Sequence, residues 1–353
     1  MNLGNLGFRL DTTETRSDLL RACEHCESQG KNMFRMVKRM SILRNAEYDF
    51  EELIGRLPEV MQNKRVIGAG KLAVEQKKFR GDPMGRVPLH RKPFLMPYGI
   101  ANYQQLDESY DNLNAPVERN TINEDELKEL ECFAADQGVT AMGYTNVDPD
   151  NIFIDRGILF DRAIVISLEM PADKVRLAPS YETLKMIEQT YARTGKAVNR
   201  LAELLRAKGF GVQAGPGLGG FTAYPVLAAD AGMGHFGRSG LLITPENGPS
   251  HRLAAVYTNI ENLPRADTHR HDWIADYCAR CGVCIKACPA QAIRETPLRL
   301  NDKHIAFIDY DRCMPYFADN YGCSVCVKVC PFFKSGYNRL HERHCSFLEL
   351  AVA

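Results

Sequence analysis

Apolar side chains recur at helical spacing in two segments of the chain. The first covers residues 124–137, where Asn123 is placed to cap the start of a helix and Gly138 to end it. The second begins after Ser180, another cap residue, and runs to about Lys208. Its apolar stripe consists of Leu184, Ile187, Tyr191, Val198, Leu201 and Leu205. The pattern therefore predicts two amphipathic helices, of which the second is long.

Shorter apolar runs, some rich in β-branched residues, lie around these helices. We predict strands at residues 139–144 and 162–170, the second of them buried, and a short strand at 209–214. Residues 241–245 and 251–260 flank the turn-forming sequence ENGPS, so we expect them to pair as a hairpin. The order helix, strand, strand, helix, strand is typical of an α/β layered domain.

The N-terminal third is less regular. Residues 1–60 are polar and helix-prone, and residues 77–103 are rich in Pro, Gly and basic side chains. A long segment of that composition in a compact protein is typically a lid, an arm or a linker. We expect residues 77–103 to form an extended arm that wraps on the core.

The composition is that of an ordinary soluble globular protein, with 45% hydrophobic and 25% charged residues. A length of 353 residues allows two or three domains. The formal net charge of zero argues against a large basic surface for nucleic acid. No apolar run approaches the length of a transmembrane helix, and the N-terminus shows neither an apolar signal core nor a twin-arginine motif. Most of the cysteines fall in a metal-binding pattern that fits a reducing compartment, so we expect a cytoplasmic protein.

That cysteine pattern occupies residues 278–331, which read CARCGVCIKACP, then DRC, then CSVCVKVCP. The C-x2-C-x2-C-x3-C-P run is the ligand pattern of bacterial ferredoxins, in which the fourth cysteine binds the neighbouring cluster. We therefore predict two 4Fe-4S clusters rather than a zinc site or disulfides. A simple ferredoxin has two residues where this chain has nine, 314–322. The expected ligands are Cys278, Cys281, Cys284 and Cys330 for the first cluster, and Cys288, Cys313, Cys323 and Cys326 for the second.

A glycine-rich string precedes the cysteines. Its glycines leave backbone amides free of side-chain cover, which suits close approach to a flat or phosphate-bearing ligand. A set of tight turns is the plainer interpretation, because the string lacks the strand and helix context of a dinucleotide site. The positions considered as binding residues are Gly215, Gly217, Gly219, Gly232, Gly234 and Gly237.

Further potential metal ligands lie at the two ends of the chain. Cys23 and Cys26 form a lone pair, and the C-terminal sequence HERHC supplies His341, His344 and Cys345. Together they could bind zinc, although such half-motifs also arise as unrelated thiols.

The string AGMGHFGRSGLLITPENGPSHRLAAVYT (231–258), followed by the double cysteine motif, resembles the cobalamin-dependent reductive dehalogenases and their relatives the epoxyqueuosine reductases. The resemblance runs from about residue 162 to 332. It is closer to the dehalogenases, because residues 177–210 are similar to their helix before the corrinoid pocket and the reductases' aspartate-bearing motif has no counterpart. The resemblance implies a nitroreductase-like core that holds a base-off corrinoid, with one cluster near the cobalt and one near the surface.

The resemblance also implies roles for two side chains. Tyr191 matches the family's proton-donating tyrosine, and Arg252 matches the basic residue beside it. A phenol with an ordinary pKa of about 10 is a weak acid at neutral pH, and a guanidinium favours the phenolate left after proton transfer. Without the resemblance, a tyrosine on the apolar stripe of a helix is more simply explained as a core residue. The sequence does not decide whether His251 faces the corrinoid or solvent.

We thus expect an α+β or α/β protein with a nitroreductase-like corrinoid-binding core and a C-terminal ferredoxin-like domain. The expected division is an N-terminal helical or extended arm (1–120), the corrinoid-binding core (121–265), the ferredoxin-like domain (266–340) and a tail (341–353). The expected activity is reductive cleavage of a carbon–heteroatom bond, most plausibly carbon–halogen, in a small molecule, with electrons from a separate donor such as a ferredoxin, a flavodoxin or a reductase. The alternatives are an epoxyqueuosine-type reductase acting on tRNA and a non-catalytic corrinoid or electron carrier. Neither a membrane nor nucleic acid is an expected partner.

Overall fold

The computed structural model describes residues 66–67, 87–153, 156–300 and 305–352. All of them belong to one compact unit, Phe50–Ala353. The helix-prone segment 1–60 and the pair Cys23 and Cys26 lie outside the described residues.

The core is a four-stranded sheet with the strand order β2-β4-β8-β5. Every neighbouring pair in it is antiparallel, with Arg162 opposite Thr258 and Gly215 opposite Ala255. The fold is therefore of the α+β kind rather than a parallel α/β sheet. The strands of this sheet are β2 (Ala141–Asn146), β4 (Arg162–Glu169), β5 (Val212–Gly215) and β8 (His251–Thr258).

Both amphipathic helices form where the sequence predicts them. The first is α6 (Glu124–Asp136), in which Asn123 and Glu126 make a reciprocal capping box. The second is α8 (Tyr181–Ala207), in which the backbone N–H of Thr183 donates to Ser180 Oγ at 3.1 Å. These caps use side-chain oxygens to satisfy backbone donors that a helix leaves unpaired at its first turn.

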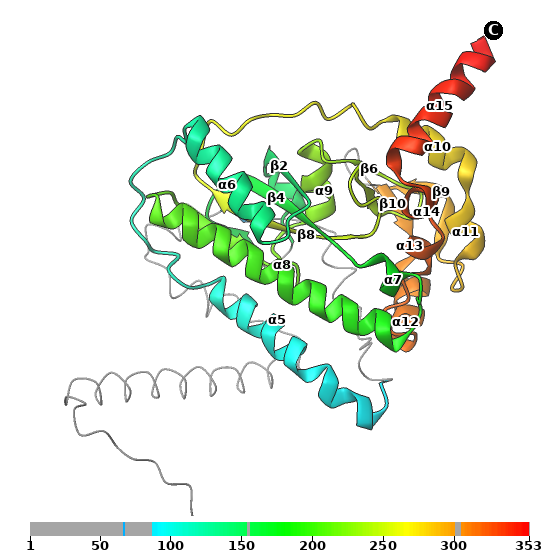
Figure 1. Ribbon diagram of the computed structural model, residues 1–353, viewed down its shortest axis with the longest axis horizontal. Coiled ribbons are helices and arrows are strands. Elements are labelled where there is room, and N and C mark those ends of the chain that lie inside the picture. Colours follow the sequence, from blue (N-terminus) through cyan, green and yellow to red (C-terminus); the bar gives the residue numbers. More distant parts are fainter. Residues whose placement is uncertain (1–65, 68–86, 154–155, 301–304, 353) are drawn as a thin grey trace, which may run out of the picture. The chain divides into compact units, whose positions relative to one another are not determined.

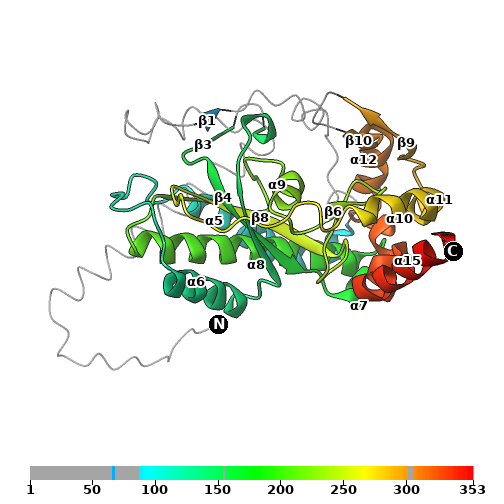
Figure 2. The same cartoon turned by 90° about the horizontal axis from the view of Figure 1, so that it is seen from above.

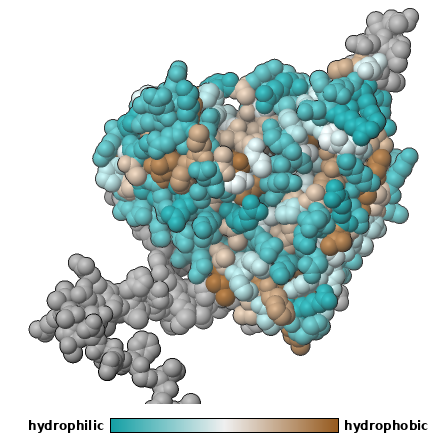
Figure 3. All heavy atoms as spheres, in the orientation of Figure 1, coloured by the Kyte–Doolittle hydropathy of each residue, from teal (hydrophilic) through white to brown (hydrophobic). Residues whose placement is uncertain are grey.

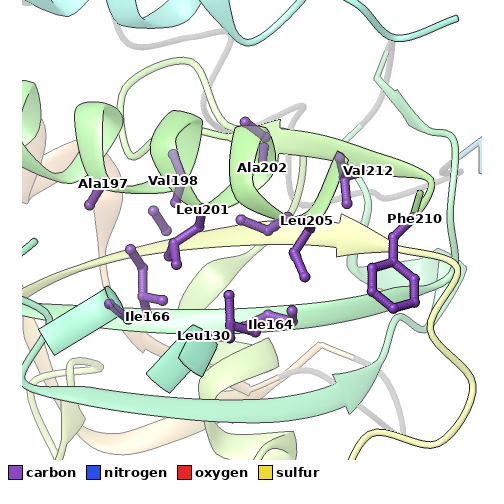
Figure 4. Close-up of a cluster of buried hydrophobic side chains, with 14 of the residues drawn as sticks. Leu130, Ile164, Ile166, Ala197, Val198, Leu201, Ala202, Leu205, Phe210 and Val212 are labelled. Atoms are coloured by element: carbon purple, nitrogen blue, oxygen red, sulfur yellow. The ribbon is translucent and has the colours of Figure 1, made fainter. Parts of the chain in front are cut away.

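Helices cover both faces of the sheet (Figures 1 and 2). On one face the C-terminal half of the α8 stripe packs with α6 on aliphatic side chains of β4 and β8, as Figure 4 shows for Leu201, Leu205 and Ile166. On the other face α9 (Tyr224–Asp230) covers an apolar group that includes Phe221 and Tyr257. The sheet is thus buried on two sides, which explains why six of the eight residues of β4 are buried.

The predicted hairpin of residues 241–245 and 251–260 is wrong. β7 (Leu242–Ile243) pairs with β6 (His235–Phe236), whereas β8 pairs with β4 and β5. The sequence ENGPS still makes a tight turn, with the backbone N–H of Gly248 donating to the Thr244 carbonyl at 2.9 Å. The turn signal was correct, but burial of β8 at the centre of the sheet decided its partners.

The expected extended arm is also wrong over its described part. Leu89–Phe94 forms a 3-10 helix, and α5 (Met96–Glu108) follows it with Pro97 in its first turn, where proline is tolerated. α5 lies against α8 so closely that a Cβ added at Gly195 would lie 2.7 Å from Gln105 Cβ. The sequence prediction missed α5 because a proline in the first turn of a helix looks the same in sequence as a proline in an extended segment.

The cysteine-rich part consists of short helices and one hairpin. The residues between Cys313 and Cys323 extend α12 to Asp319 before the chain turns back. The elements are α10 (Trp273–Cys281), α11 (Val283–Ala287), β9 (Ile293–Arg299), β10 (Ile305–Ile308), α12 (Tyr310–Asp319), α13 (Val325–Val329), α14 (Pro331–Ser335) and α15 (Tyr337–Val352). The remaining short elements are α7 (Ala172–Val175), a 3-10 turn at Pro149–Asn151, and β1 (Val66–Ile67) paired with β3 (Gly157–Ile158).

The face seen in Figure 1 is mainly hydrophilic, with apolar residues in small separate patches (Figure 3). Within the described residues, no helix has both the length and the apolar character needed to cross a membrane.

Candidate functional site

The eight predicted ligand cysteines come from neighbouring short elements of the C-terminal part. None of them is in a disulfide, and each is partly buried. Left-handed backbone at Gly282 and Ser324 starts α11 and α13, so that each C-x2-C run is wound around a tight turn. Tight turns bring thiols close in space that are separated by only a few residues.

The first group is Cys278, Cys281, Cys284 and Cys330. Burial raises the pKa of Cys278 to about 11, and the negative charges of Cys281 and Cys284 add to this effect. Burial likewise raises the pKa of Cys330 to about 12, with further repulsion from Cys278 and Cys284. These four thiols therefore lie close enough to feel one another's charge, and they form the set expected for the first cluster.

The second group is Cys288, Cys313, Cys323 and Cys326. Burial raises the pKa of Cys313 to about 11, and Cys288 and Cys323 are the thiols that add to it. Burial raises the pKa of Cys326 to about 12, and Cys323, Cys313 and Cys284 add to it in that order. The electrostatic neighbours thus separate into the two predicted sets, joined where Cys326 meets Cys284.

The donor chemistry of both groups fits iron–sulfur clusters. Buried thiolates that repel one another need a cation to neutralise them, and four cysteines per cubane supply the ligands. Among the described residues, no three Cys, His, Asp or Glu side chains gather closely enough for a single metal ion.

Aromatic side chains surround the first group. Trp273, the only tryptophan of the chain, packs with Tyr277 and Phe332 beside Cys278 and Cys330. The glycine-rich string reaches the same place, because the backbone N–H of Arg238 hydrogen bonds Cys278.

Arg238 is a residue that the sequence analysis missed. Its charge acts on both Cys278 and Cys284. Arg238 directly follows Gly237 in the sequence GRSG, and this position beside a candidate binding glycine is the signal that could have identified it.

The second group lies against α8. Cys326 and Tyr191 pack against the same buried cluster, which includes Ile187 and Val327. A Cβ added at Gly322 would lie 3.1 Å from Ile187 Cδ1. The Lys328 ammonium donates to the carbonyl of Ala178 at 2.7 Å and so ties this part to the start of α8.

Tyr191 and Arg252 lie together, as the sequence led us to expect. The guanidinium carbon of Arg252 lies 4.4 Å from the centre of the Tyr191 ring. Arg252 Nε is buried without a hydrogen-bond partner among the described residues. A buried donor of this kind is costly unless a further group reaches it.

His251 belongs to the opposite face of the sheet. Successive strand residues point to opposite faces, and Ala254 and Val256 share the α8 side with Arg252. His251 therefore lies on the side of Ala255 and Tyr257, which pack under α9. Its Nδ1 is buried without a described partner, and burial lowers its pKa to about 4.

The six glycines do not lie in one place. A Cβ at Gly217 would lie 3.2 Å from Tyr191 Cδ1, and one at Gly237 would lie 3.6 Å from Cys278 Sγ. Close packing accounts for glycine at the other four positions. The contacts there are Tyr224 for Gly215, Leu106 for Gly219, Ala266 and Asp267 for Gly232, and the Ile243 carbonyl for Gly234.

The C-terminal part of the suggested zinc set is engaged with protein groups. His344 Nδ1 lies 2.9 Å from the Arg280 guanidinium, and Cys345 Sγ lies 3.8 Å from His341 Nε2. Cys23 and Cys26 lie outside the described residues, so the zinc site stays a hypothesis from the sequence.

Comparison with known proteins agrees with these features. Residues 277–333 match the family model described as a 4Fe-4S dicluster domain. The tetrachloroethene reductive dehalogenase of Desulfitobacterium hafniense is 34% identical over 211 residues, which is 56% of this chain and 37% of that protein. An epoxyqueuosine reductase of Francisella cf. novicida (strain Fx1) is 30% identical over 114 residues, 30% of this chain and 31% of that protein. The chain thus matches about a third of the length of these relatives.

A solved reductive dehalogenase, described as suggesting a mechanism for B12-dependent dehalogenation, shares the fold. It superposes with a TM-score of 0.61 over 80% of this chain and 44% of the other, at 15% identity. In sequence and in fold, the chain is similar to the reductive dehalogenases, and over a shorter stretch of sequence to the epoxyqueuosine reductases.

Proposed function

We propose that this chain is a corrinoid- and iron–sulfur-dependent reductase that replaces a carbon-bound halogen by hydrogen. The contact between Tyr191 and Arg252 is the observation that carries the proposal. It places a proton-bearing group beside a fixed positive charge, with Gly217 packed against the ring. The reaction consumes two electrons and one proton for each halide released.

The cofactors in this proposal are two 4Fe-4S clusters and a base-off cobalamin in a nitroreductase-like core. When bound, the corrinoid would supply the low-valent cobalt that breaks the carbon–halogen bond, and the clusters would supply single electrons. Gly217 lets the glycine-rich segment pack on the Tyr191 ring, and Arg252 Nε is a buried donor without a partner among the described residues. The six glycines remain the proposed corrinoid-binding set, with Gly217 the best supported.

The chain's own residues have separate tasks in this scheme. Tyr191 donates the proton from its hydroxyl, and Arg252 stabilises the phenolate by its charge. The eight cysteines hold the clusters, and the second group shares its apolar surroundings with Tyr191. A separate protein donor would deliver electrons, and the cysteine usage supports a reducing compartment such as the cytoplasm.

Dehalogenation is favoured over reduction of a modified tRNA base. The dehalogenase match covers 211 residues, against 114 for the epoxyqueuosine reductase. The formal net charge of zero gives no support to broad contacts with a phosphate backbone.

The test is made on anaerobic, cluster-replete protein with hydroxocobalamin. We expect about eight iron atoms and eight sulfides per chain, a spectrum shifted toward the base-off form, and halide release from a chlorinated or brominated substrate under a strong reductant. Absence of corrinoid binding would leave an electron carrier as the better explanation. Corrinoid binding with turnover only of an epoxyqueuosine-containing tRNA would transfer the proposal to the second family.

A further inference from the structure

Three buried hydroxyl groups form a chain behind the segment 215–220, on the side away from Tyr191. The Tyr224 hydroxyl donates to the carbonyl of Pro216 at 3.1 Å. The hydroxyls of Tyr257 and Thr222 lie 2.8 Å apart, and Tyr257 also hydrogen bonds Tyr224. Burial raises the pKa of both tyrosines, so both keep their protons.

The Tyr224 hydroxyl is the donor to the backbone. A carbonyl oxygen can only accept, so the proton of Tyr224 goes to Pro216. In the pair of Tyr257 and Thr222 either hydroxyl can donate. The hydroxyl chain thus ends on the backbone of the glycine-rich segment.

The glycines of that segment let it lie directly on the Tyr224 ring. A Cβ at Gly215 would lie 2.7 Å from Tyr224 Oη, and one at Gly220 would lie 2.5 Å from the ring. Such distances are well inside van der Waals contact, so a side chain at either position would push the segment off the ring. Gly215 and Gly220 therefore both pack on Tyr224, and Pro216 between them accepts its hydrogen bond.

The other side of the same segment meets the candidate catalytic pair. A Cβ at Gly217 would lie 3.2 Å from Tyr191 Cδ1 and 3.3 Å from the carbonyl of Leu253, the residue after Arg252. Gly217 directly follows Pro216, so the backbone that Tyr224 holds is the backbone that touches Tyr191.

We propose that Tyr224 is a positioning residue for the Tyr191–Arg252 pair, acting through its hydrogen bond to Pro216 and the contact of Gly217 with the Tyr191 ring. Tyr257 and Thr222 hold the Tyr224 hydroxyl in the orientation that this bond requires. The inference rests on the proposed function for its effect on turnover, but its structural part does not.

The test uses full-length holoenzyme with 3-fluorotyrosine at position 191, so that fluorine NMR reports on that ring alone. Tyr224→Phe removes the hydroxyl and keeps the ring. We expect the fluorine resonance of residue 191 to shift or broaden. We also expect kcat to fall by about tenfold to 100-fold, because small misplacements of a reacting group cost this much. KM should be almost unchanged, and the solvent deuterium isotope effect should increase. Tyr144→Phe is the matched control, since it also removes a hydrogen-bonded phenol, which lies 2.7 Å from Glu131 Oε1 and 3.2 Å from Met142 Sδ at the far edge of the sheet.

Two further variants keep the inference testable if Tyr224→Phe folds poorly. Thr222→Val removes the far end of the chain and should shift the resonance less, whereas Gly217→Ala should shift it more. An unchanged resonance in Tyr224→Phe, or in both further variants, would overturn the positioning role. A shifted resonance in a protein that releases no halide would retain the positioning role and reject the proposed activity.

Discussion

The two cysteine groups share one sequence pattern and lie in different surroundings. The first packs among Trp273, Tyr277 and Phe332, beside Arg238. The second packs through Cys326 against aliphatic side chains of α8. The neighbours of the first group are mainly aromatic and cationic, and those of the second mainly aliphatic, with Tyr191 and Phe333 packed against the same cluster.

From this difference we infer an order for the proposed clusters. Cys326 and Tyr191 share one hydrophobic cluster, and Cys284 of the first group acts on Cys326. Electrons arriving at the first group would therefore pass to the second group before they reach the catalytic pair. Two copies of one motif can thus take different roles because different side chains pack against them.

The largest effect is expected from removing the second group. Cys326→Ser should lower the iron content from about eight to about four per chain and abolish turnover with any reductant. Cys278→Ser should lose as much iron but keep part of the turnover with a small reductant that reaches the second cluster directly. Halide release by the two variants, with protein and small-molecule donors, checks this order, and equal turnover of the two would contradict it.

Apolar truncations should separate the two surroundings. Ile187→Ala and Ile274→Ala each remove most of a buried side chain, at 5% and 0% exposure, and should each cost about 2–5 kcal/mol of unfolding free energy. Thermal unfolding measures the loss. Electron paramagnetic resonance should show Ile187→Ala altering the second cluster and Ile274→Ala the first; the reverse assignment would disprove the order above.

Acid should destabilise the α9 side of the sheet through His251, whose pKa burial lowers from 6.5 to about 4. Below pH 6.5 the unfolded chain binds a proton that the folded protein excludes, so stability falls as the pH drops toward 4, by about 3 kcal/mol in total. His251→Asn should flatten the unfolding free energy over this window. His269→Asn, at an exposed histidine, is the control, and an unchanged pH dependence in His251→Asn would refute the assignment.

The smallest expected effect is a change in tryptophan fluorescence. Because the single tryptophan packs beside the first group, loading that cluster should quench its fluorescence. Reconstitution should quench wild type and Cys326→Ser strongly but Cys278→Ser only weakly. Equal quenching in both variants would show that Trp273 does not distinguish the clusters.

Local signals explain what the sequence predicted well. Ser180 and Asn123 cap their helices within three residues, so α8 and α6 were placed almost to the residue. The cysteine spacing is a local constraint in the same way. The cysteines whose charges act on Cys278 and Cys313 fall within the expected ligand sets, and the sets themselves stay a prediction.

Long-range contacts explain the features that the sequence did not predict. The partners of β8 depend on β4 and β5, which no turn signal encodes. The side on which His251 lies depends on register, since a shift of one residue would exchange it with Arg252. The contact of Gly217 with Tyr191 likewise joins elements that are separated along the chain.

The most direct test of the central claim is halide release by Tyr191→Phe in cluster-replete, cobalamin-loaded protein. Removal of a positioned proton donor should slow release by a factor of about 100 to 10,000, with iron content and corrinoid binding unchanged. Tyr181→Phe, which removes a phenol from the same helix that donates to the Arg91 carbonyl at 3.1 Å, should remain within a few-fold of wild type. Release by Tyr191→Phe at the wild-type rate would show that Tyr191 only packs and would contradict the proposed mechanism.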